Sequence, residues 1–281
     1  MTVLPDEVTT DQLYRRMRHL MGKAVADFGM IQEGDRVAVA VSGGKDSYTM
    51  LLLLEELRRR APVSFELIAL NIDSGYPGYR TDVIEGFLRE RGTAYRMVPT
   101  EHYAIIQEKR RPGSSFCSIC ARLKRGTLYS VARELGCNKL ALGHHRDDFI
   151  ETLLLNQFFV GSLKAMSASM LADDGVTTVI RPLVYVAESD IISYSRQASL
   201  PVVCCCCPVC GKADMQRKRM KNLLKELEKD IPHIRNSLLK SLSNVHPRHL
   251  LDGRLKTATP ISAPDPVPGD LSGKQDRNIL P

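Results

Sequence analysis

The chain has 281 residues, and its 39 Lys and Arg against 32 Asp and Glu give a formal net charge of +7 at pH 7. This length allows one large or two modest domains with a hydrophobic core. No stretch reaches the roughly 18 consecutive apolar residues of a membrane-spanning helix, and the first residues lack a secretory pattern. We therefore expect a cytoplasmic protein without membrane contact, and the basic charge favours a polyanionic partner.

The N-terminal part of the chain predicts a helix followed by a strand, a glycine turn and a second helix. Leu13, Met17, Leu20 and Ala24 recur at helical spacing, which predicts an amphipathic helix over residues 9–29. Residues 37–41 are continuously apolar, as in a strand buried on both faces of a parallel sheet. The segment S-G-G-K-D-S follows at residues 42–47, and we expect Ser47 to cap a helix that runs to Arg60.

This strand, turn and helix predict an anion site. Gly43 and Gly44 allow backbone amides to approach an anion closely, and the positive end of the helix dipole points at the same place. Lys45 adds a full charge. The segment is not a Walker P-loop, because that motif needs glycine at Val39 and Ser or Thr at Asp46.

The alternation of strands and helices continues along the chain. Strands are predicted over residues 65–73, 94–98 and 139–142. One helix is predicted over residues 80–91, a second ends near Leu135, and a third begins near Asp147. This order predicts an α/β fold, a doubly wound and mostly parallel sheet with ligands beyond the carboxyl ends of the strands. Three of those ends carry Ser42, Asp73 and Gly143.

Composition suggests four segments. They are an N-terminal amphipathic helix over residues 1–29, an α/β domain over 30–203, a Cys-rich and basic helical region over 204–255, and a disordered tail over 256–281. The chain has eight cysteines, five of them within residues 204–210. In a reducing compartment this clustering favours metal or sulfur chemistry over disulfides.

Four motifs in a fixed order carry a resemblance to a known family. S-G-G-K-D-S resembles the signature of the PP-loop pyrophosphatases, which split ATP between its α and β phosphates. It is followed by C-S-I-C at 117–120, G-H-H-R-D-D at 143–148 and C-P-V-C-G at 207–211. Together these motifs resemble the TtcA-type tRNA 2-thiocytidine synthetases over about residues 10–254.

The resemblance implies an iron–sulfur tRNA sulfurtransferase. ATP would adenylate the C2 oxygen of an anticodon-loop cytidine, and sulfur at an open iron would then replace it. Cys117 and Cys120 would hold a 4Fe-4S cluster together with one later cysteine. Counting back from Gly211 selects Cys207 as this third ligand, with Cys205, Cys206 and Cys210 as the alternatives.

The same resemblance assigns the nucleotide site. Phosphate binding falls on Ser42, Gly43, Gly44, Lys45, Asp46 and Ser47, and Lys45 and Asp46 are also expected to act in catalysis. We interpret Asp46 as a Mg²⁺ contact, because a carboxylate beside a triphosphate needs a cation between them. Asp73 is placed either to hold the nucleoside or to cap the following turn. Gly143 suits close approach by ATP, and Asp148 or Glu151 could serve metal or general-base chemistry.

Two basic regions are candidate tRNA surfaces. Residues 107–126 hold six Lys or Arg against one acid, and residues 212–254 hold eleven against five. In the second region Met220, Leu223, Leu227 and Ile231 predict an apolar helix face, with the lysines elsewhere on the surface. A cysteine desulfurase or another sulfur donor is an expected partner. The sequence leaves the oligomeric state open, with a homodimer among the alternatives.

Two other functions remain open at this stage. The two C-x-x-C pairs also fit structural zinc, which would make the chain a zinc-containing RNA-binding protein with a PP-loop fold. A lysidine synthetase-like ligase shares S-G-G-x-D-S but needs no cysteine cluster, so the eight cysteines speak against it.

Overall fold

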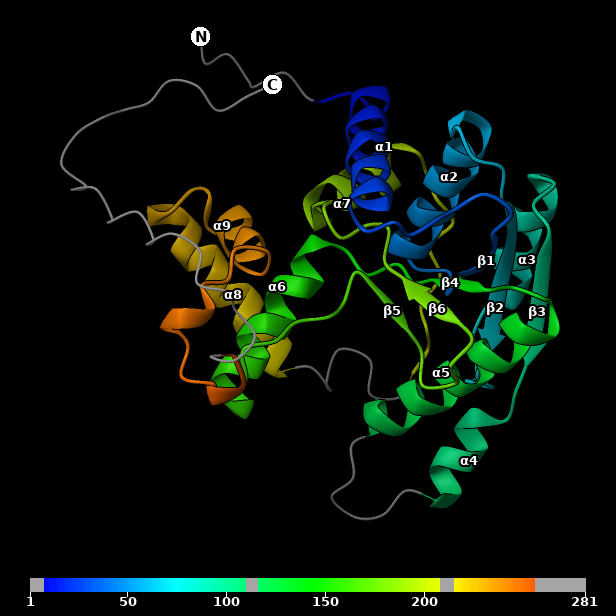
Figure 1. Cartoon of the computed structure of the whole chain (residues 1–281). Helices are drawn as coiled ribbons and strands as arrows, with labels where there is room; N and C mark the ends of the chain where they lie inside the picture. Colours follow the sequence, from blue (N-terminus) through cyan, green and yellow to red (C-terminus); the bar gives the residue numbers. More distant parts are fainter. Residues whose placement is uncertain (1–7, 110–115, 208–214, 256–281) are drawn as a thin grey trace, which may run out of the picture. The chain divides into compact units, whose positions relative to one another are not determined.

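The computed structural model describes residues 8–109, 116–207 and 215–255 (Figure 1). The chain divides into two compact units, Met1–Leu242 and Ser243–Pro281. In the second unit the described part holds two short 3-10 helices, η2 (Pro247–His249) and η3 (Gly253–Leu255). The predicted tail over 256–281 lies outside the described residues. None of the helices in the described ranges has the length and apolar character to cross a membrane.

The centre of the first unit is a six-stranded sheet with the order β3-β2-β1-β4-β6-β5. Its strands are β1 (Arg36–Ala40), β2 (Glu66–Asp73), β3 (Tyr95–Pro99), β4 (Lys139–Ala141), β5 (Ser169–Leu171) and β6 (Thr178–Ile180). All neighbouring pairs are parallel except β5 with β6, so the predicted mostly parallel α/β sheet is confirmed. The strand order reverses between β1 and β4, where doubly wound sheets bind ligands.

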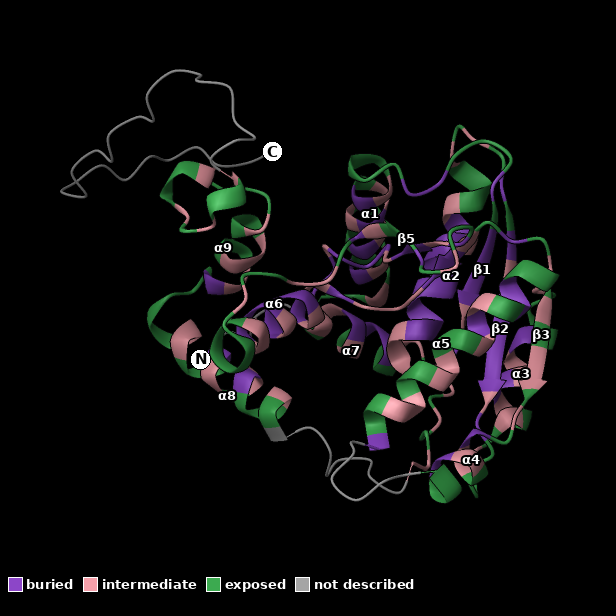
Figure 2. Ribbon diagram, turned by 60° about the horizontal axis from the view of Figure 1, so that its bottom comes forward, coloured by how far each residue is buried: buried purple, intermediate pink, exposed green. Residues whose placement is uncertain are grey.

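Helices cover both faces of this sheet. The helices of this unit in the described ranges are α1 (Thr10–Asp27), α2 (Lys45–Arg60), α3 (Thr81–Glu90), α4 (His102–Lys109), α5 (Phe116–Glu134), α6 (Arg146–Leu155), α7 (Glu188–Gln197), α8 (Met215–Asp230) and α9 (Ile234–Ser241). A π-helix, η1 (Asn156–Val160), continues α6. One face is covered by α2 and α3, with α1 and α7 packed on α2, and the other face is covered by α5 (Figure 1). Figure 2 shows β1 and β2 buried between these layers.

The predicted N-terminal helix is an integral part of this core. Thr9 caps α1 in a capping box with Gln12, and Leu13, Met17 and Ala24 are buried against α2 and α7. Residues 1–242 thus group as one unit, whereas the sequence suggested boundaries near residues 29 and 203. The reason is physical: the apolar stripe of α1 needs a partner, and the sheet-covering helices provide it.

Helix α8 packs on α6 rather than on the sheet. Met220 and Leu224 are buried against Ile150 and Leu154 of α6. The predicted apolar face is therefore shifted: Leu224 replaces Leu227 as its buried centre, and Ile231 is half exposed. Since α6 begins at the carboxyl end of β4, this packing brings α8 beside the end of the sheet where ligands bind.

Candidate active site

The glycine turn after β1 is held in one conformation by hydrogen bonds on both sides. Ser47 Oγ donates to the Gly44 carbonyl (2.9 Å) and accepts from the Ser42 amide (3.2 Å). The predicted Ser47 cap is wrong, because α2 already begins at Lys45 with Gly44 as its N-cap. The helix therefore starts earlier than predicted, and Ser47 is buried in its first turn, where its two hydrogen bonds hold the loop.

Gly43 is the position where only glycine fits. Its φ is +77°, and an added Cβ would lie 2.2 Å from Val203 Cγ2. The Val203 amide donates to the Gly43 carbonyl (3.0 Å), so the segment after α7 runs directly along the turn. This contact brings the cysteine run at 204–207 next to the glycine turn.

Two other strand-end residues have structural roles that the sequence left open. A Cβ on Gly143 would lie 3.3 Å from the Asp46 carbonyl carbon and the Ser47 amide, so Gly143 lets α2 start against the end of β4. Asp73 Oδ1 accepts from the Gly75 amide (2.8 Å) and caps the turn after β2. Contacts of Asp73 and Gly143 with a nucleotide stay predictions.

Lys45 lies at the start of α2 in a network of charges. Its ammonium contacts Asp46 Oδ1 (2.9 Å) and Glu188 Oε1 (3.3 Å). Lys221 of α8 bonds both oxygens of the same Glu188 carboxylate, at 3.0 and 2.9 Å. Burial alone would raise the pKa of Glu188, but the Lys221 hydrogen bond and the Lys45 and His145 charges outweigh it and hold the pKa at about 2. Glu188 is therefore ionised.

Below this network lies Glu151, a fully buried carboxyl of α6. Neither of its oxygens has a hydrogen-bond partner among the described residues. Burial raises the pKa of Glu151 to about 7. The Lys221 charge lowers the pKa of Glu151 but does not offset burial. Its ammonium lies 3.7 Å from Glu151 and is closer to Glu188, at 2.9 Å. Of the two predicted acids, Asp148 instead contacts Arg217 (3.1 Å) and the His145 amide (3.0 Å).

The histidines after β4 are buried beside these acids. Burial, followed by the Arg181 charge, lowers the pKa of His144 to about 4. Arg181 Nε donates to His144 Nδ1 at 3.2 Å, which requires a neutral ring. His145 Nε2 lies 3.7 Å from Asp46 and 3.8 Å from Glu188. His145 Nδ1 lies 3.4 Å from Asp148 Oδ2, so this ring packs against the first turn of α6.

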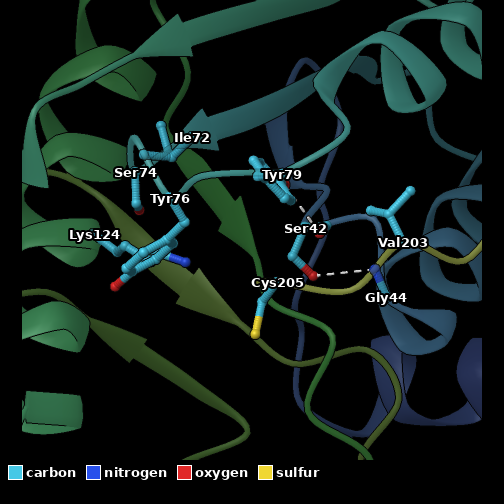
Figure 3. A pocket seen from close by; sticks show the side chains of 9 residues that line it. All are labelled: Ser42, Gly44, Ile72, Ser74, Tyr76, Tyr79, Lys124, Val203 and Cys205. Atoms are coloured by element: carbon cyan, nitrogen blue, oxygen red, sulfur yellow. Dashed lines mark hydrogen bonds between the residues drawn. The ribbon is translucent and has the colours of Figure 1, made fainter. Parts of the chain in front are cut away.

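A cavity of about 210 Å³ connects the glycine turn with the cysteines (Figure 3). Its wall contains Ser42 and Gly44 of the turn, Ile72, Ser74, Tyr76 and Tyr79 from the end of β2 onward, Lys124 of α5, and Val203 and Cys205. Ser74 Oγ is buried and has no hydrogen-bond partner in the described ranges. An unpaired buried hydroxyl beside a cavity is what a polar ligand would satisfy.

Tyr76 is the centre of the sulfur side. Its hydroxyl lies 3.1 Å from Cys120 Sγ, and its ring packs on Tyr103 and Phe116. Burial, then Cys120 and Cys207, raise the pKa of Tyr76. The structure therefore brings two of the three predicted cysteines, 87 positions apart in sequence, to one hydroxyl group.

The other cysteines differ in their surroundings. Cys206 Sγ donates to the Gly78 carbonyl (3.3 Å), while Cys205 lines the cavity and Cys117 is exposed on the first turn of α5. Cys210 lies outside the described residues. Cys137 is buried and burial raises its pKa, which fits an unreactive thiol. In the parts of the chain that the structure describes, no three His, Cys, Asp or Glu side chains are arranged to hold a metal ion.

The predicted basic surfaces are only partly exposed. Lys221, expected on the surface, is half-buried and bonds to Glu188, whereas Lys218 and Lys225 are exposed. Lys124 lies over the Tyr76 ring, with 5.8 Å from its Nζ to the centroid, and lines the cavity. Sequence reasoning missed Tyr76 and Glu188 as site residues. The available signals were a tyrosine close after a strand end and a glutamate at the start of a helix, and both patterns are common.

Known proteins resemble this chain in sequence and in fold. The chain matches the PP-loop domain family over residues 9–204. It is 72% identical to a tRNA-cytidine(32) 2-sulfurtransferase of Citrifermentans bemidjiense over 86% of this chain and 95% of that protein. It is 68% identical to a protein of that name from Pelobacter propionicus, over 91% and 95% of the two chains.

A solved structure shares the fold. It is the U34-tRNA thiolase NcsA from Methanococcus maripaludis with its [4Fe-4S] cluster, with a TM-score of 0.68 and 24% sequence identity. The match covers 84% of this chain and 79% of that one.

Proposed function

From its membership of the PP-loop family and, within it, of the tRNA-cytidine(32) 2-sulfurtransferases, we propose the reaction of this chain. It replaces the C2 oxygen of cytidine 32 in tRNA by sulfur and cleaves ATP to AMP and pyrophosphate. The observation that carries the proposal is the cavity between the glycine turn and the cysteines. A nucleotide at Ser42 and Gly44 and a sulfur species near Cys120 and Cys207 would meet across it.

The first half of the reaction is adenylation. The amides of the turn and the first turn of α2 would bind the phosphates, and Lys45 would screen the negative charge as pyrophosphate leaves the α phosphorus. The C2 oxygen of the cytidine attacks that phosphorus. Asp46 would hold a Mg²⁺ ion between itself and the phosphates. The Ser74 hydroxyl supplies an unsatisfied polar group for the bound nucleotide.

The second half replaces the activated oxygen. A sulfur nucleophile attacks C2, and AMP leaves with the former C2 oxygen. A [4Fe-4S] cluster held by three cysteines would supply an iron with an open position for a sulfur species. The residues fit this group: Cys120 and Cys207 both lie beside the Tyr76 hydroxyl, and Cys117 is one helical turn from Cys120. This grouping favours Cys207 over Cys206, which bonds to Gly78 instead.

The expected partners follow from the chemistry. The tRNA would contact exposed lysines such as Lys218 and Lys225 through its phosphates. Lys124 stands at the cavity itself and would contact the nucleotide or the flanking phosphate. A cysteine desulfurase or another sulfur donor would load the site between turnovers.

The test combines metal analysis with nucleoside analysis. The protein is purified without oxygen, assayed for iron, sulfide and zinc, and incubated with ATP, a sulfide source and unmodified tRNA. We expect iron and sulfide, ATP-dependent 2-thiocytidine, and release of AMP and pyrophosphate. Zinc without iron would contradict the cluster and favour the zinc-containing RNA-binding alternative. Adenylation without thiolation of cytidine would contradict the substrate.

A further inference from the structure

One carboxylate stands between the nucleotide loop and the basic helix α8. Glu188 is the first residue of α7, and its amide donates to Asp147 Oδ2 of α6 (2.8 Å), which holds its backbone in place. Its side chain reaches Lys45 on one side (3.3 Å) and Lys221 on the other (2.9 Å). These two lysines are 176 positions apart in sequence.

The two lysines compete for the same atom. Both ammonium groups contact Glu188 Oε1, at 3.3 Å from Lys45 and 3.0 Å from Lys221. Two like charges at one oxygen repel each other, so each weakens the contact of the other with Glu188. If one lysine leaves, the carboxylate binds the remaining lysine more tightly. Glu188 is about one-fifth exposed, so screening by solvent reduces this exchange without removing it.

An arriving triphosphate offers Lys45 a second anion. Lys45 is the cation of the glycine turn, and phosphates bound at Ser42 and Gly44 lie within reach of the first turn of α2. When Lys45 turns toward them, Glu188 is left to Lys221. When α8 moves away, Lys221 leaves Glu188. Glu188 then binds Lys45 more tightly and competes with the phosphates for this lysine.

Helix α8 responds to this exchange because Lys221 is one of its few inward-directed charges. The helix is anchored by the buried Met220 and Leu224 and by two cations that reach into the acids below, Arg217 and Lys221. Its outer face is exposed and basic. A stronger bond between Lys221 and Glu188 therefore stabilises the docked position of this face.

We propose that Glu188 competes with a bound nucleotide for Lys45 and that, by sharing its carboxylate with Lys221, it couples nucleotide binding at the glycine turn to the docking of α8. The inference rests on the ATP-binding part of the proposed function and is independent of which RNA is modified. Nucleotide binding stabilises the packing of α8 on α6. Because such coupling is reciprocal, the packed position of α8 raises the affinity for the nucleotide.

The first experiment measures amide hydrogen exchange of α8 with and without α,β-methylene ATP, in the absence of RNA. In the wild-type protein the analogue should slow exchange of α8 by roughly fivefold, the lower end of typical coupling between sites. In Glu188→Gln the analogue should bind but leave α8 exchange unchanged. Lys229→Gln removes one lysine of α8 that contacts Glu226 instead, and should respond like the wild type.

The second experiment is a double-mutant cycle on the affinity for the same analogue. Lys221→Met should weaken binding of the analogue roughly fivefold. Glu188 has then lost Lys221, binds Lys45 more tightly and competes with the phosphates for it. In the Glu188→Gln background the same Lys221→Met change should have no effect, since the competing carboxylate is gone. A merely structural role of Lys221 would weaken binding equally in both backgrounds.

The outcomes separate the two proposals. Binding of the analogue without a change in α8 exchange, or additive effects in the cycle, would overturn the role of Glu188 and leave the proposed function standing. Failure of the wild-type protein to bind the analogue would overturn both. If Glu188→Gln does not fold, the Lys221→Met variant still decides: its α8 exchange must no longer respond to the analogue.

Discussion

Replacing Glu151 by Gln tests the buried acid beneath the nucleotide loop. The side chain is fully buried, and its two oxygens have no hydrogen-bond partner in the described part of the chain. Glutamine has nearly the same shape but cannot ionise. The substitution therefore removes the titration of this group and changes little else in its packing.

The magnitude follows from the pKa. Burial raises the pKa of Glu151 from its ordinary 4.5 to about 7, and each pKa unit is worth about 1.4 kcal/mol. Because the folded pKa is the higher one, the stabilising contribution is fully present below about pH 4.5 and is lost as the pH rises through about 7. The unfolded chain gives up its proton first, so the free energy of unfolding falls by about 3 kcal/mol over this window.

The assay is urea denaturation followed by circular dichroism, under reducing conditions, between about pH 4.5 and pH 8. The free energy of unfolding of Glu151→Gln minus that of the wild type should rise by about 3 kcal/mol across this range. Glu226→Gln, on the exposed side of α8, is the matched control and should give a constant difference. A difference for Glu151→Gln that is equally flat would refute the burial argument, since the carboxylate would then be solvated or paired in the folded protein.

Three further substitutions test the loop and the sulfur side. Gly43→Ala places a Cβ against Val203 at a φ of +77°, and should abolish nucleotide binding measured by calorimetry. Tyr76→Phe keeps the ring and removes only the hydroxyl beside Cys120; we expect faster loss of iron to a chelator, at unchanged nucleotide affinity. Cys207→Ala should lose the iron and the thiolation activity, whereas Cys137→Ala should keep both; equal iron content in the two variants would contradict the ligand assignment.

The experiments on Glu188 and those on the cysteines address two different pockets: Cys205 lines the cavity beside the glycine turn, whereas Glu188 lines a separate pocket together with Lys221. If both proposals hold, the nucleotide loop is connected to the RNA-facing helix by one carboxylate and to the sulfur side by one tyrosine. Both connecting residues follow the carboxyl end of the sheet, Tyr76 after β2 and Glu188 after β6. The doubly wound topology brings these loops together, which explains why the site assembles at the point where strand order reverses.

The sequence by itself determined the features that depend on neighbouring residues. The apolar run at 37–41 and the glycine turn predicted β1 and the anion site, because burial on both faces and a left-handed turn each leave a local pattern. The spacing of Leu13 and Met17 predicted α1 for the same reason. The three-residue strands β5 and β6 were not predicted, whereas the equally short β4 was, because β4 lies between a predicted helix and the G-H-H-R-D-D motif, and β5 and β6 have no such flanking signal.

Only the tertiary structure decided which distant side chains meet. The contact of Lys45 with Glu188 spans 143 positions and that of Tyr76 with Cys120 spans 44. Neither pair has a local pattern, since each depends on how strands and helices are ordered around the sheet. The burial of Glu151 is of the same kind: a glutamate on a helix is ordinarily solvated, and it is α8, arriving about 70 residues later in the chain, that covers it.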